Sequence, residues 1–176
     1  LRIADPFCGV GPALATLLAE ADLVSDLLAT DLNPDAVKLL MSNLSKWDRR
    51  TYPDGAIELQ RIHENRLVGM ADALTLGDDS EIAGKWDLVL VNLPHRTIEF
   101  LPAIIPLLNR NSPSMIRGRA IVDESEIEQA NETIRACLPK LMPNKPQPSL
   151  KIKRDYSSTL RLCSFQAWLS PQEETN

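Results

Sequence analysis

The sequence predicts an α/β fold in which a doubly wound, mostly parallel sheet ends in an antiparallel edge. Segments with strand patterns alternate with segments of helical pattern along most of the chain, an order that is typical of parallel sheets. The run 86–91 is almost continuously apolar, as expected for a central strand that is covered on both faces. The last two strand-like segments, 150–154 and 160–169, follow one another with no helix between them, and they predict an antiparallel pair.

The individual elements follow from local patterns. Strands are expected at 1–4, 27–30, 66–70, 86–91, 119–122, 150–154 and 160–169. Helices are expected at 12–21, 34–47, 56–63, 98–108 and 125–141. Pro34 suits the first turn of its helix, with Asn33 or Asp31 as the N-terminal cap. Ser125 and Glu128 have the spacing of a capping box at the start of the last helix.

Length and composition limit the classes of protein that fit. The 176 residues have the length of a single domain, and no apolar run is long enough to span a membrane. The net charge of −5 is not typical of a nucleic-acid-binding protein, although basic residues gather at 110–119 and 145–161. Three widely spaced cysteines predict no metal site and suit a reducing compartment, so we expect a cytoplasmic protein. Because Leu1 already lies in the first expected strand, we expect a single domain, 1–176, that lacks an N-terminal part.

Two motifs predict a site for an adenosine-containing cofactor. A glycine-rich turn follows the first strand, and Asp31 follows the second strand, twenty positions after Gly11. In this pairing the turn offers backbone groups to the ligand and the carboxylate binds ribose hydroxyls. The expected cofactor-binding residues are Asp5, Phe7, Gly9, Val10, Gly11, Asp31, Leu32, Asp72, Ala73 and Asn92. A glycine turn that binds no ligand is the alternative.

Details of the turn favour S-adenosylmethionine over a dinucleotide. The third glycine of a dinucleotide fingerprint is replaced by Leu14, and Pro12 removes a backbone N–H that a pyrophosphate would use. S-adenosylmethionine has no phosphate and carries a sulfonium cation, which suits the carboxylate of Asp5 beside the turn.

The loop after the fourth strand supplies the expected catalytic residues, which are Asn92, Pro94 and His95. An asparagine amide can accept from an N–H and donate to a carbonyl, and Pro94 would stiffen the loop that presents it. His95 could contact substrate or relay a proton. The alternatives are a strand-end cap for Asn92, no role for His95 and an N-terminal cap for Asp72. Cys8 lacks a neighbouring base and is expected to pack in the core.

Together these segments resemble the archaeal and eukaryotic tRNA (guanine-37 N1)-methyltransferases and the related aminocarboxypropyl transferase of the wybutosine pathway. The resemblance rests on the segments 5–12, 30–34 and 92–101, of which the last is the most specific. It implies a class I methyltransferase fold with a seven-stranded sheet, S-adenosylmethionine as cofactor and tRNA as the partner.

The same resemblance implies methyl transfer to N1 of the guanine that lies 3′ of the anticodon. In that family a small tRNA-binding domain and catalytic polar residues precede the glycine turn, and this chain has neither. Two alternatives stay open. One is a transferase of the same fold that acts on another RNA position, a protein or a small molecule, a class that includes aminocarboxypropyl transfer to a wybutosine precursor in tRNA. The other is a non-catalytic scaffold with a methyltransferase-like fold.

Overall fold

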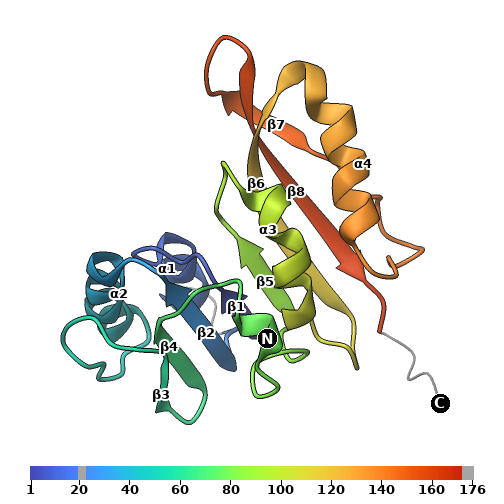
Figure 1. The fold of residues 1–176 in the computed structure, drawn as a ribbon. Coiled ribbons are helices and arrows are strands. Elements are labelled where there is room, and N and C mark those ends of the chain that lie inside the picture. The colour runs from blue at the N-terminus through green and yellow to red at the C-terminus, as the bar shows by residue number, and fades with distance from the viewer. Residues whose placement is uncertain (20–22, 172–176) are drawn as a thin grey trace.

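The structure is a computed structural model that describes residues 1–19 and 23–171 (Figure 1). The expected end of the first helix, near Ala21, lies outside the described residues. The strands are β1 Arg2–Asp5, β2 Asp26–Asp31, β3 Gln60–His63, β4 Arg66–Met70, β5 Leu88–Val91, β6 Ser114–Asp123, β7 Lys151–Asp155 and β8 Leu160–Leu169. The α-helices are α1 Pro12–Ala19, α2 Pro34–Trp47, α3 Thr97–Ile104 and α4 Ile127–Cys137. Short 3₁₀ turns are η1 Leu76–Asp78, η2 Ile105–Leu107 and η3 Glu124–Glu126.

All described strands form one sheet in the order β3-β4-β2-β1-β5-β6-β8-β7. The strands from β4 to β6 are parallel, whereas β8 runs antiparallel to both β6 and β7. The expected doubly wound sheet with an antiparallel C-terminal edge is therefore confirmed. The chain proceeds outward from β1 through β2 to β4, then returns to the other side of β1 as β5 and β6. This reversal between β1 and β5 is where such sheets bind ligands, beyond the carboxyl ends of the strands.

The sheet has eight strands rather than seven, because the segment expected as a helix at 56–63 forms β3. Gln60 pairs with Val68 in an antiparallel hairpin, so β3 covers an edge of β4 that would otherwise be open. Pairing with a neighbouring strand outweighs the weak local preference for a helix. The helix at 56–63 was therefore a wrong prediction.

The expected capping box at the start of α4 is also wrong. Asp123, at the end of β6, accepts hydrogen bonds from the backbone N–H and the hydroxyl of Ser125, at 3.0 and 2.6 Å. Ser125 therefore belongs to the 3₁₀ turn η3, and Glu128 instead contacts Arg135 at 2.9 Å. The cap expected for α2 is confirmed, since the side chain of Asn33 accepts a hydrogen bond from the N–H of Asp35.

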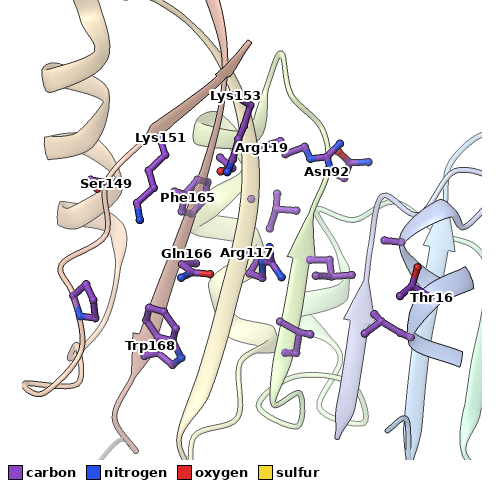
Figure 2. Close-up of a pocket in the computed structure, with 18 of the residues that line it drawn as sticks. Thr16, Asn92, Arg117, Arg119, Ser149, Lys151, Lys153, Phe165, Gln166 and Trp168 are labelled. Carbon is purple, nitrogen blue, oxygen red and sulfur yellow. The ribbon is translucent and has the colours of Figure 1, made fainter. Parts of the chain in front are cut away.

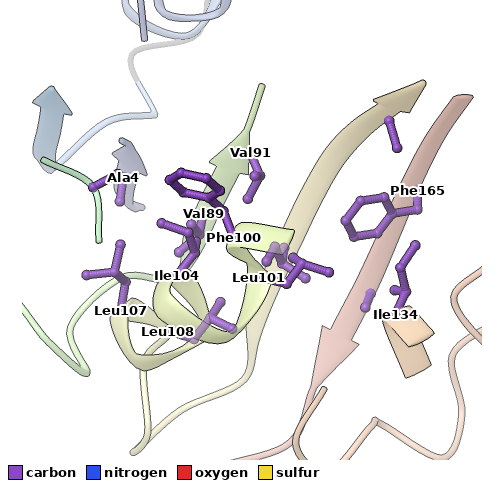
Figure 3. Packing of buried hydrophobic residues seen from close by; sticks show 14 of the residues in the cluster. Ala4, Val89, Val91, Phe100, Leu101, Ile104, Leu107, Leu108, Ile134 and Phe165 are labelled. Atoms are coloured by element: carbon purple, nitrogen blue, oxygen red, sulfur yellow. The ribbon is translucent and has the colours of Figure 1, made fainter. Parts of the chain in front are cut away.

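Helices lie on both faces of the sheet (Figure 1). Leu27 and Ala29 of β2 pack with the apolar face of α2, while Leu28, between them, belongs to the core on the opposite face. That second core lies beneath α3 and α4, where Phe100, Leu101 and other side chains pack on the central strands (Figure 3). No described helix is both long enough and apolar enough to span a membrane.

Candidate functional site

The turn between β1 and α1 depends on two glycines with left-handed backbone. Gly9 and Gly11 have φ of 55° and 84°, a region that side-chain-bearing residues rarely adopt. A Cβ on Gly11 would also lie 2.8 Å from a methyl group of Leu40. The turn is held from outside, because Cys8 N–H donates to the Thr30 carbonyl at 3.0 Å and the amide of Asn43 donates to the Val10 carbonyl at 2.9 Å. The turn that the sequence predicts is therefore present and hydrogen-bonded to β2 and α2.

Asp31 connects this turn to the end of β2. One carboxylate oxygen accepts from the Gly9 N–H at 2.8 Å, and the other accepts from the Asn33 N–H at 2.9 Å. Each oxygen retains a further lone pair that a ligand hydroxyl can use. Leu32, the next residue after Asp31, is 70% exposed, so its apolar side chain is open to solvent.

Asp5 is the most unusual group at the site. Its side chain is buried, and its Oδ1 has no hydrogen-bond partner among the described residues. Burial is the main reason that its pKa rises from 3.8 to about 7, and the nearby charge of Asp31 adds to this effect. A buried carboxylate with one oxygen left unpaired is suited to a cationic ligand.

Cys8, as expected from the sequence, packs in the core. It is 3% exposed, and burial together with the carboxylates of Asp5 and Asp31 raises the pKa of its thiol. A thiol held in its neutral form is a poor nucleophile, so the chemistry of the site does not depend on it.

Asp72 follows β4 and lies exposed at the same rim of the sheet. The Ala71 N–H donates to the Asp31 carbonyl at 3.3 Å, which keeps the segment after β4 beside the end of β2. Asp72 also accepts from the Leu74 N–H at 3.0 Å, in agreement with the alternative role as a cap. The side chain of Ala73 packs in the core, so only its backbone can face a ligand.

The loop after β5 is fixed by its backbone and leaves Asn92 available. The Pro94 carbonyl accepts from the Ile121 N–H of β6 at 2.8 Å, and the Thr97 hydroxyl donates to the Leu93 carbonyl at 2.9 Å. Within the described part of the chain, the amide of Asn92 forms no hydrogen bond, and it borders a groove of about 740 Å³. The alternative role of Asn92 as a strand-end cap therefore has no bond to support it.

His95 is exposed, and its contact partner was not foreseen from the sequence. Its Nε2 lies 3.2 Å from the hydroxyl of Tyr156, and the two rings meet edge to face with centroids 5.4 Å apart. Tyr156 belongs to the β7–β8 turn, which is 61 residues away in sequence. Periodicity within single elements contains no signal for such a contact.

The fold thus gathers most of the expected residues at one rim. The turn after β1 and the end of β2 are joined by hydrogen bonds, and Phe7 meets Phe100 of α3 edge to face at 5.5 Å. The groove of about 740 Å³ includes Asn92, but its lining does not include Asp5, Asp31 or Asp72. Among the described residues, no group of three His, Cys, Asp or Glu side chains is arranged to hold a metal ion.

This topology and this glycine turn define a Rossmann-like fold of the class I methyltransferase type. The chain is similar over 97% of its length to the structure of Methanocaldococcus jannaschii TYW2 in complex with AdoMet, with a TM-score of 0.71, 19% identity and 68% of that chain covered. It is similar over 98% of its length to the M. jannaschii tRNA m1G37 methyltransferase, with a TM-score of 0.65, 16% identity and 45% of that chain covered.

A curated sequence relative agrees with this assignment. The tRNA (guanine(37)-N(1))-methyltransferase Trm5b of Pyrococcus abyssi is 35% identical over 105 residues, which is 60% of this chain and 25% of the relative. The chain therefore spans about a quarter of the length of that relative. No protein-family model matches the chain. The similarity to these proteins confirms the resemblance that the sequence motifs indicate.

Proposed function

We propose that the protein containing this domain catalyses S-adenosylmethionine-dependent methylation of tRNA at N1 of the guanine 3′ of the anticodon. The observation that carries the proposal is the 35% identity to Trm5b over 105 residues. The chain covers a quarter of that relative, so the activity is assigned to the protein that contains this domain rather than to the domain alone.

The residues present fit the cofactor. The buried Oδ1 of Asp5 lacks a partner among the described residues and can face a cationic group, and the carboxylate of Asp31 has lone pairs left for ribose hydroxyls. Gly9, Val10 and Gly11 offer turn backbone, while Phe7, Leu32 and the Asp72–Ala73 segment lie around the same rim. Bound S-adenosylmethionine would supply an activated methyl group on its sulfonium.

Asn92 is the residue that we assign to the substrate. Its amide can donate to a purine carbonyl and accept from a ring N–H, and so orient the base for in-line attack. The anchored backbone at Pro94 fixes the loop that carries Asn92, which lowers the entropy cost of the reactive geometry. His95 is kept as a candidate for substrate contact, in partnership with Tyr156.

Aminocarboxypropyl transfer is the second candidate, because the likeness to the TYW2 structure extends over 97% of this chain. Both reactions use the same cofactor, through different carbons of the sulfonium.

We place the protein in the cytoplasm, since all three cysteines are free.

One experiment separates these functions. The full-length protein is incubated with S-adenosylmethionine and, in separate reactions, with unmodified tRNA and with tRNA that carries a wybutosine precursor. The nucleosides of each product are then analysed by mass. Methylated guanosine supports the proposal, whereas an aminocarboxypropyl product on a wybutosine precursor supports the second candidate. A protein that neither binds the cofactor in calorimetry nor modifies tRNA is a scaffold, and the proposal is then wrong.

A further inference from the structure

One face of the sheet forms an open groove of about 740 Å³ beyond the cofactor rim. It extends over β5, β6, β8 and β7 on the side opposite α3 and α4, with the start of α1 at its border (Figure 2). Because residues alternate between faces of a strand, Gly118 and Ala120 pack in the protein while Arg117 and Arg119 point into the groove.

Strand pairing brings together two basic groups that are far apart in sequence. Arg119 pairs with Ser164 of β8, and Ser164 pairs on its other side with Lys151 of β7. Arg117, one row along, pairs with Gln166. The intervening strand thus contributes only neutral polar side chains to the groove between the basic ones. Figure 2 shows Arg117, Arg119, Gln166 and Lys151 on one face, together with Lys153 of β7.

The positive charge of this groove has no counter-charge in the described part of the chain. Arg117, Arg119, Lys151 and Lys153 are all exposed, and none of the four forms an ion pair with a described residue. No acidic residue within 1–19 or 23–171 lines the groove, although the whole chain has a net charge of −5. Four like charges gathered on one surface repel one another, and a polyanion would relieve that repulsion.

The groove also has features that suit a nucleic acid more than an acidic protein. Asn92 lies at one end, so a chain lying in the groove leads to the proposed substrate residue. Trp168 lies towards the other end, half-buried, with the ammonium group of Lys145 at 5.6 Å from its ring centroid. A tryptophan beside cationic side chains is an arrangement on which bases stack while the backbone is neutralised.

We propose that this groove, formed by Arg117, Arg119, Lys151 and Lys153, binds the phosphate backbone of the RNA substrate and directs it towards Asn92. The inference rests on the proposed function and adds the surface by which the substrate is held. Successive basic residues on one face of a strand lie roughly 7 Å apart, so several phosphates can be contacted at once.

The test compares charge-neutralised variants of the full-length protein. One variant carries Arg117→Gln and Arg119→Gln, a second carries Lys151→Gln and Lys153→Gln, and the control carries Lys38→Gln and Lys46→Gln on α2. Binding of unmodified tRNA is measured across a series of salt concentrations, and S-adenosylmethionine binding is measured by calorimetry.

Both groove variants are expected to lose about tenfold in tRNA affinity or more at low salt and to keep their cofactor affinity. The slope of log affinity against log salt should become shallower by roughly 0.7–0.9 for each phosphate that the variant no longer neutralises. The control pair should bind tRNA like the unchanged protein. If the unchanged protein modifies tRNA while the groove variants bind it with normal affinity and slope, the groove inference is wrong and the proposed function stands. If the unchanged protein modifies no tRNA, the proposed function fails by itself.

Lysine acylation of the full-length protein distinguishes RNA from a polypeptide as the occupant of the groove. Lys151 and Lys153 are expected to react in the free protein and to be protected when tRNA is added. Protection of both lysines without RNA would mean that a protein segment covers this face, and that result would overturn the inference.

Discussion

The Gly9 N–H donates to a carboxylate oxygen of Asp31 at 2.8 Å, which joins the glycine turn after β1 to the end of β2. The two motifs that indicate a cofactor in the sequence are therefore one hydrogen-bonded unit in the structure. Asp31 has a structural role as well as its proposed ligand role, because its other oxygen accepts from the Asn33 N–H.

Replacing Asp31→Ala should weaken S-adenosylmethionine binding by roughly 1–3 kcal/mol, the cost of removing charge-assisted hydrogen bonds to hydroxyl groups. Calorimetry measures this effect, and thermal unfolding without ligand measures the separate contribution of the bonds to Gly9 and Asn33. Asp35→Ala is the matched control, since it removes a nearby exposed carboxylate. Unchanged cofactor affinity in Asp31→Ala would show that the cofactor lies elsewhere.

Asp5 should make both stability and cofactor binding depend on pH. Its pKa is about 7 in the folded protein and 3.8 in its ordinary state, so the folded form retains a proton that the unfolded form releases. Between about pH 4 and 7 the free energy of unfolding should therefore fall as pH rises. Cofactor affinity should rise from pH 6 to 8, because the carboxylate that forms would face a cation.

Asp5→Asn tests this pair of effects. The variant should lose the pH-dependent part of its cofactor affinity, and without ligand it should gain stability at pH 8 relative to the unchanged protein. Thermal unfolding and calorimetry at pH 6 and pH 8 provide the measurements, with Asp54→Asn in an exposed loop as the control. The same pH profile of cofactor affinity in Asp5→Asn and in the unchanged protein would contradict the assigned role.

Much of this arrangement is local enough to be predicted from the sequence. The alternation of strands and helices, the glycine turn and the position of Asp31 depend on short-range patterns, and these expectations agree with the structure. The cap at Asn33 was foreseen because its signal lies within three residues. The loop residues Asn92 to His95 follow directly from the end of a strongly apolar strand.

Features that depend on distant pairing could not be predicted. The segment that forms β3 has no strong strand pattern of its own, and its conformation comes from pairing with β4. Strand register determines the contact of His95 with Tyr156. It also places Arg119 and Lys151 on either side of Ser164 of β8. Register over such distances follows from the whole sheet and not from local composition.

Gly118 of β6 should not tolerate a side chain. A Cβ at this position would lie 2.3 Å from a ring carbon of Phe165, its partner on β8. Gly118→Ala is therefore expected to destabilise the protein by about 1–3 kcal/mol, as overpacking of cores does.

Denaturant unfolding measures that destabilisation, and a double-mutant cycle identifies its cause. Phe165→Ala alone removes a buried ring and should cost about 3–5 kcal/mol. In the double variant the alanine at 118 has space, so the combined destabilisation should be smaller than the sum of the two single effects. Additive effects would mean that Phe165 is not what excludes a side chain from position 118.

Asn92→Ala should separate catalysis from cofactor binding in the full-length protein. The amide of Asn92 forms no hydrogen bond with a described residue, so its removal should leave the fold and the cofactor rim unchanged. Turnover on unmodified tRNA should fall by roughly tenfold to a hundredfold or more, the size expected when a group that orients the reacting base is removed. Single-turnover kinetics and calorimetry measure the two quantities.

Asn43→Ala is the control, because Asn43 supports the glycine turn through the Val10 carbonyl and should affect cofactor affinity first. Equal reductions of turnover and cofactor affinity in Asn92→Ala would assign Asn92 to the cofactor rather than to the substrate.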